Sequence, residues 1–162
     1  MQGSSRASAA HGQRALDAVL GQAPALRPDP AALADDLFGV GGAIDGSVTL
    51  RRALTDPTRE ASAKAGLVRR LLTGKVSESA IALVSTLVEQ RWSAERDLTD
   101  TVENFAVQSL VASAESAGRA DQVEDELFRF ERLVAGTPAL RDAVTDRHAD
   151  PAAQGALVDR LL

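Results

Sequence analysis

The sequence predicts an all-α fold: a six-helix bundle followed by a partial second copy of that bundle. Three observations predict it. Apolar residues recur at helical spacing, and no segment alternates apolar and polar residues as a strand does. Aromatic residues make up only 3% of the chain, so leucine, valine and alanine must fill the space between closely packed helices. In addition, a segment near the middle of the chain recurs towards its end.

Capping residues and prolines define the first three helices. Ser4 or Ser5 can cap a first helix that reaches about Gln22, where a proline-rich linker begins. An aspartate followed by a proline at the first helical position predicts a second helix over 30–45. Ser47 can cap a short third helix with the sequence "VTLRRAL".

The next three helices follow from similar signals. The Asp-Pro pair at 56–57 predicts the start of a fourth helix that ends at Leu72. Ser77 begins a fifth helix, and a long sixth helix runs over 93–117. At about 1.5 Å per residue, the sixth helix spans roughly 37 Å. We therefore place the first domain at 1–117.

The repeat relates two segments that lie ninety residues apart. Residues 33–72 match residues 123–162 at fifteen of forty positions without a gap. The identities include glycine and aspartate residues that mark helix ends, and chance similarity between helices rarely preserves such boundaries. We infer an internal duplication in which 118–162 is an incomplete second repeat, with helices equivalent to those of 30–72.

The second copy departs from the first at one place. Its Asp146-Arg147 replaces an Asp-Pro pair, and Asp150-Pro151 follows four residues later. Because proline breaks a helix from within, the last helix of this copy is expected to start about one turn later than its counterpart. Counterparts of the fifth helix and of the rest of the sixth are absent, as is any C-terminal domain, so the chain is expected to be a fragment. The apolar residues left short of partners are Leu133, Leu140, Val144 and Leu157.

Composition excludes several classes of function. A net charge of −5 gives no general affinity for nucleic acid. The chain has no cysteine, so it has no disulfide framework and no cysteine-ligated zinc. No apolar run approaches the roughly 18 residues of a membrane span, which argues against direct membrane insertion.

No catalytic, cofactor-binding or metal-binding residue is identified. The glycine-rich stretch 39–46 follows no strand, so it predicts no dinucleotide site. The segment 73–77 contains Gly-Lys, but Arg69 stands where a phosphate-binding loop requires its first glycine. His11 and His148 lie far apart in sequence, and no nucleophile motif accompanies either.

Two features are candidate interaction surfaces. Seven basic residues stand between Arg51 and Lys75, and they form either a binding surface or an ordinary solvated face. The apolar faces of the first and fifth helices form either a groove for a partner helix or plain core. The apolar residues of these two faces are Ala15, Leu16, Val19, Leu20, Ile81, Val84, Leu87 and Val88.

Several motifs in order resemble one family. The segments "TLRRALTDP" (49–57), "AKAGLVRRLLTGKVS" (63–77) and "QRWSAERDL" (90–98) look like the delta subunit of actinobacterial F-type ATP synthases. The segment "EDELFRFERLVAGTPALRDAVTDR" (124–147) is similar to the repeat that follows in those proteins. The resemblance covers essentially the whole chain.

The resemblance implies a non-catalytic stator role at the cytoplasmic face of the cell membrane, peripheral to it through the complex. In this family, related to the oligomycin-sensitivity-conferring protein, the subunit links the catalytic head to the peripheral stalk during proton-driven ATP synthesis. The family's first bundle holds an N-terminal helix of an alpha subunit between its first and fifth helices. This would set Ala15, Leu16, Val19 and Leu20 opposite Ile81, Val84, Leu87 and Val88, with no cofactor involved. The b subunit would bind through the missing C-terminal region.

The runner-up hypothesis is an all-helical adaptor or regulator unrelated to ATP synthase. In that case the duplication merely supplies two similar protein-binding modules. Co-purification with alpha and b subunits would favour the first hypothesis, and its absence the second.

Overall fold

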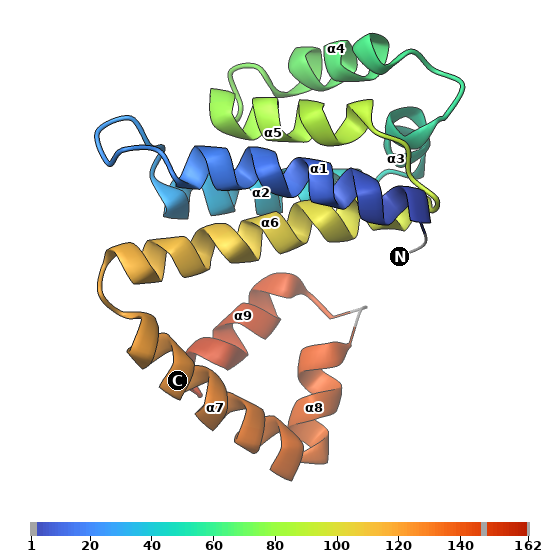
Figure 1. Cartoon of the computed structure of the whole chain (residues 1–162). Coiled ribbons are helices and arrows are strands. Elements are labelled where there is room, and N and C mark those ends of the chain that lie inside the picture. Colours follow the sequence, from blue (N-terminus) through green and yellow to red (C-terminus); the bar gives the residue numbers. More distant parts are fainter. Residues whose placement is uncertain (1–2, 147–148, 162) are drawn as a thin grey trace. The chain divides into compact units, whose positions relative to one another are not determined.

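The computed structural model describes residues 3–146 and 149–161 (Figure 1). Within these residues every regular element is a helix, and there are nine of them. The predicted all-α class is therefore confirmed for the described part of the chain. The chain divides into two compact units: unit 1 extends to Ser113 and unit 2 begins at Ala114.

Most of the first six helices lie in unit 1. Their bounds are α1 Gly3–Leu20, α2 Pro30–Asp45, α3 Val48–Thr55, α4 Ala61–Leu72, α5 Glu78–Glu89 and α6 Glu95–Ser116. The last turn of α6 belongs to unit 2. Three predicted N-caps are confirmed, because the side chains of Asp29, Ser47 and Ser77 each accept a hydrogen bond from a backbone N–H of the following helix.

The predicted start of the fourth helix is wrong. The carboxylate of Asp56 accepts hydrogen bonds from the backbone N–H of Thr58 at 2.8 Å and from its hydroxyl at 2.6 Å. These bonds hold a turn after α3 and lower the pKa of the Asp56 carboxyl. Because Asp56 is used in this turn, α4 begins only at Ala61, with Glu60 in the N-cap position.

The helices of unit 1 share one hydrophobic core, and each of α1 to α6 contributes to it. Buried core residues include Leu16, Leu33, Leu37, Ile44, Leu54, Val68, Leu83, Val84, Leu87, Val88, Leu98, Val102 and Phe105. Gly12 shows how closely α1 packs. A Cβ at this position would overlap the side chain of Leu87 on α5 and lie 3.1 Å from Phe105 on α6. Since both neighbours are buried, neither can give way easily.

Unit 2 repeats the helix boundaries of unit 1. Its helices are α7 Ala120–Gly136, α8 Pro138–Thr145 and α9 Pro151–Asp159. They begin ninety residues after the starts of α2, α3 and α4. The expected start of the last helix at Pro151 is confirmed, and Asp150 caps it. The prediction that α9 starts about one turn later than its counterpart α4 is wrong. Both helices start at equivalent positions, because α4 also begins later than its Asp-Pro pair suggested.

The packing of unit 2 is thin within its described residues. Neither α7 nor α8 has a fully buried residue. Leu127 and Phe128 are 62% and 61% exposed, and Leu133 is 42% exposed. Unit 2 therefore gains much less from hydrophobic burial than unit 1 does.

We expect amide hydrogens in α7, α8 and α9 to exchange faster than those of α5. Local opening costs little free energy where few apolar contacts are broken, and more than half of the residues of α5 are buried, whereas α7 and α8 have no buried residue. Native-state hydrogen exchange read by mass spectrometry measures this difference. Equal protection in α5 and α7 would contradict it and would mean that α7 is covered in solution.

Candidate partner-binding surfaces

The eight residues predicted to form a groove divide into two sets. Leu16, Ile81, Val84, Leu87 and Val88 are at most 1% exposed. Ala15, Val19 and Leu20 are half-buried and pack against the same core. Figure 1 shows α1 and α5 side by side, and the two helices pack closely against each other. A partner could therefore reach only the half-buried set without opening unit 1, and partner binding through this face stays a prediction.

A hollow, which shares only Val84 with the predicted groove, was missed by the sequence reasoning. It has a volume of about 320 Å³, lies among α2, α3, α4 and α5, and is mostly apolar. Its lining includes Val40, Leu50, Leu54, Leu71, Val76 and Val84, with Lys75 beside them. Helical periodicity could not reveal it, because the same apolar pattern describes core residues and residues that border a hollow.

The basic segment between Arg51 and Lys75 is not a single surface. Lys64 is buried, and its ammonium group donates a hydrogen bond to the backbone carbonyl of Gln90 at 3.2 Å. This bond joins α4 to the end of α5. Burial lowers the pKa of Lys64, while the charge of Asp56 opposes that shift.

Replacing Lys64 by methionine is expected to change how stability depends on pH. Because the pKa of Lys64 is lower in the folded state, the unfolded chain binds more protons between that pKa and about 10.5. The wild type should therefore gain stability relative to Lys64→Met as pH rises through this window. Urea unfolding at several pH values above neutrality measures the difference.

The partner of Lys64 is a neutral carbonyl, and its charged neighbours are Asp56, Arg91 and Glu89. Lys75→Met is the matched control, because Lys75 is exposed. A stability difference between wild type and Lys64→Met that stays constant across the window would contradict the expectation.

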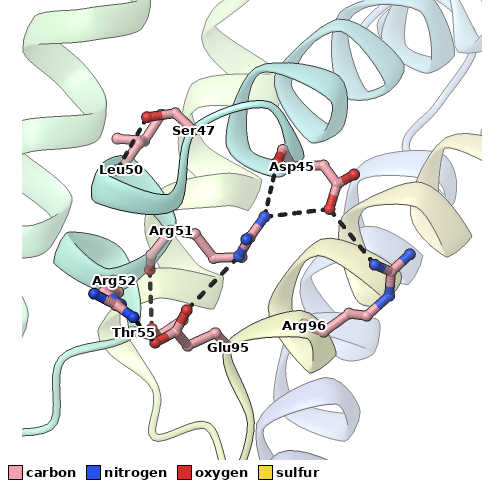
Figure 2. A network of polar contacts seen from close by, with 8 residues as sticks. All are labelled: Asp45, Ser47, Leu50, Arg51, Arg52, Thr55, Glu95 and Arg96. Carbon is pink, nitrogen blue, oxygen red and sulfur yellow. Dashed lines mark hydrogen bonds and ion pairs between the residues drawn. The ribbon is translucent and has the colours of Figure 1, made fainter. Parts of the chain in front are cut away.

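Arg51 is the centre of a polar network that joins α2, α3 and α6 (Figure 2). Its guanidinium donates to the backbone carbonyl of Asp45 at 2.7 Å and lies 3.3 Å from the Asp45 carboxylate. Glu95 pairs with Arg51 at 3.7 Å and with Arg52 at 3.5 Å. Arg96 pairs with Asp45 at 3.8 Å. Partly exposed ion pairs of this kind contribute little energy each, and together they link the start of α6 to α2 and α3.

The described residues offer no evident catalytic apparatus. Among them, no three histidine, aspartate or glutamate side chains are placed to hold a metal ion together. His11 lies beside Arg14 on α1, and His148 lies outside the described residues. None of the described helices is both long enough and apolar enough to cross a membrane.

The described part of the chain is thus an all-helical protein with apolar side chains available for contact with other proteins. No protein-family model matches the chain. It is 48% identical to "ATP synthase subunit delta" of Kineococcus radiotolerans, over 99% of this chain and 57% of that protein. For the proteins of the same name from Streptomyces avermitilis and Thermobifida fusca the identities are 46% and 43%, over 99% and 100% of this chain.

Over its whole length the chain is therefore a relative of the actinobacterial ATP synthase delta subunits, and the resemblance seen in its motifs is confirmed. The chain spans only about 58% of the length of these relatives.

Proposed function

We propose that the chain forms part of a non-catalytic stator subunit of F-type ATP synthase. In this role it helps to connect the catalytic head to the peripheral stalk, at the cytoplasmic face of the cell membrane. The observation that carries the proposal is the identity of 42–48% to delta subunits over 99–100% of the chain. An all-helical core without an evident catalytic cluster in the described residues supports a connecting role.

The N-terminal helix of an alpha subunit is the partner we propose for unit 1. It would lie along α1 and α5, on the half-buried side chains of Ala15, Val19 and Leu20. The fully buried residues of this face, including Leu16 and Leu87, would support the site from beneath. The b subunit would bind through parts of the delta subunit that the chain does not span.

Binding to the catalytic head tests this function. The purified chain is mixed with an actinobacterial ATP synthase head from which the delta subunit has been removed, and co-sedimentation is measured. We expect the wild type to sediment with the head. Val19→Arg should weaken this binding, because it sets a charge against an apolar partner surface. Thr49→Arg on the exposed side of α3 is the control and should bind as the wild type does.

One result would count against the stator role, and another would count against the proposed contact face. If the wild type does not sediment with the head, the all-helical adaptor becomes the better reading. If the wild type binds and Val19→Arg binds equally well, the stator role stands but the α1–α5 face is not the contact. Circular dichroism of each variant shows whether its helices are intact.

A further inference from the structure

The corner between α7 and α8 in unit 2 is built like the corner between α2 and α3 in unit 1. The guanidinium of Arg141 donates to the backbone carbonyl of Ala135 at 3.1 Å, and Arg51 does the same to Asp45 at 2.7 Å. The hydroxyl of Thr145 bonds to the carbonyl of Arg141 at 2.7 Å, as its counterpart in α3 does at 2.9 Å. The repeat is therefore present in side-chain geometry as well as in sequence.

In unit 1 this corner is covered by α6. Glu95, the first residue of α6, pairs with Arg51 at 3.7 Å (Figure 2). Two turns further along, α6 comes so close to Gly41 that a Cβ there would lie 3.3 Å from Cγ of Glu103. Leu37, at the centre of the α2 face, is 0% exposed.

Within the described residues of unit 2 itself, the equivalent corner is open. Leu127, the counterpart of Leu37, is 62% exposed. A largely apolar hollow of about 620 Å³ lies between α7 and α8. It is lined by Leu127, Phe130, Glu131, Val134, Ala135, Arg141 and Val144. Among the described residues of unit 2, no carboxylate forms an ion pair with Arg141, whereas in unit 1 Glu95 pairs with its counterpart Arg51.

The charges around the hollow define which helix can fill it. A carboxylate placed as Glu95 is placed would pair with Arg141. In unit 2 the counterpart of Gly41 is Glu131. If the partner helix carried a carboxylate at the position of Glu103, that carboxylate would lie close to Glu131 and be repelled by it. A basic residue there would instead attract Glu131. The two required charges are eight residues apart, which is about two helical turns.

We propose that the α7–α8 corner binds an amphipathic partner helix of defined charge pattern. This helix has a carboxylate in its first turn, apolar residues three and seven positions later, and a basic residue eight positions later. The apolar spacing is that of Glu95, Leu98 and Val102 in α6. The helix pairs its carboxylate with Arg141, covers Leu127, and sets its basic residue beside Glu131. The site is inferred from the repeat and does not depend on the proposed role in ATP synthase.

A synthetic peptide of residues 93–110, carrying Glu103→Lys, is the probe. Its binding to the whole chain is followed by fluorescence anisotropy. We expect it to bind about fivefold more tightly than the unmodified peptide, because a repulsive contact with Glu131 becomes attractive. A scrambled peptide of the same composition should not bind measurably.

Charge exchange tests the orientation of the helix. Arg141→Glu in the protein should weaken binding of the probe about tenfold, and Glu95→Arg in the probe should restore it. Arg141→Lys should retain most of the binding, which shows that the charge matters and not merely the fold of the corner. Leu127→Asp should abolish binding, whereas Leu26→Asp, in an exposed linker of unit 1, should have no effect.

Three outcomes would overturn the proposal. The probe and its scrambled form could bind equally, which would make the corner a non-specific apolar surface. Binding could be unchanged by Arg141→Glu, which would exclude the proposed ion pair. Sedimentation could show a wild-type dimer that Leu127→Asp dissociates, in which case the occupant is a second copy of the chain.

Discussion

Replacement of Leu16 by aspartate is expected to unfold unit 1. Leu16 is 0% exposed, and α1 packs so closely at Gly12 that its neighbours cannot move aside. Burying an unpaired carboxylate in such a core costs several kcal/mol, which is comparable with the whole stability of a small domain at about 5–15 kcal/mol. Thermal unfolding followed by circular dichroism should show the loss of the cooperative transition of unit 1.

Ala18→Asp is the matched control for this substitution. Ala18 is on the same helix and is exposed, so its replacement should leave the transition within a few degrees of the wild type. If α1 instead formed one wall of an open groove, the opposite result would be expected. Leu16 would then be partly exposed to water, and an aspartate at this position would be tolerated. A near-normal transition for Leu16→Asp would therefore support the groove and contradict the close packing of α1.

Local chemistry made the helix starts at Asp29, Ser47 and Ser77 predictable from sequence. Each side chain satisfies a backbone N–H that lies within three residues of it, so no distant part of the chain has to be known. Asp56 shows where this reasoning stops. Its carboxylate had two possible uses, capping a helix or holding a turn, and the sequence alone does not decide between them.

The sequence indicated which side chains face the core, but not how far each of them is buried. Helical spacing placed Leu16 and Val19 on one face of α1, yet the first is fully buried and the second only half-buried. Periodicity describes one helix at a time, whereas exposure depends on the helices that cover it. The burial of Lys64 was the hardest to predict, because lysine is almost never fully buried and its hydrogen bond to Gln90 joins residues that lie 26 positions apart.

The candidate site in unit 2 could be recognised only from the sequence and the structure together. The alignment of the two copies pairs Arg51 with Arg141 and Leu37 with Leu127. It does not say that one leucine is buried and the other exposed, or that Arg141 makes the same backbone hydrogen bond as Arg51. Those facts depend on which helices are present around each copy.

Truncation of Leu37 and of Leu127 to alanine should have very different consequences. Leu37→Ala removes a fully buried side chain and leaves a cavity, which should cost roughly 2–5 kcal/mol of unfolding free energy. Leu127→Ala removes a side chain that is 62% exposed and should cost less than about 1 kcal/mol. Trp92, the single tryptophan of the chain, is buried in unit 1 and reports its unfolding in urea by fluorescence. Helical circular dichroism reports both units.

The comparison is informative because the two leucines have the same place in the repeat and differ in what covers them. The difference between the two losses of unfolding free energy therefore measures how much the helices that cover Leu37 in unit 1 contribute, because the described part of unit 2 has no such helices over Leu127. Adding the Glu103→Lys peptide should narrow this difference, since Leu127→Ala would then also remove contacts with a bound helix. If Leu127→Ala is as costly as Leu37→Ala without any peptide, Leu127 is already covered in solution. In that case the α7–α8 corner is not free to bind a partner.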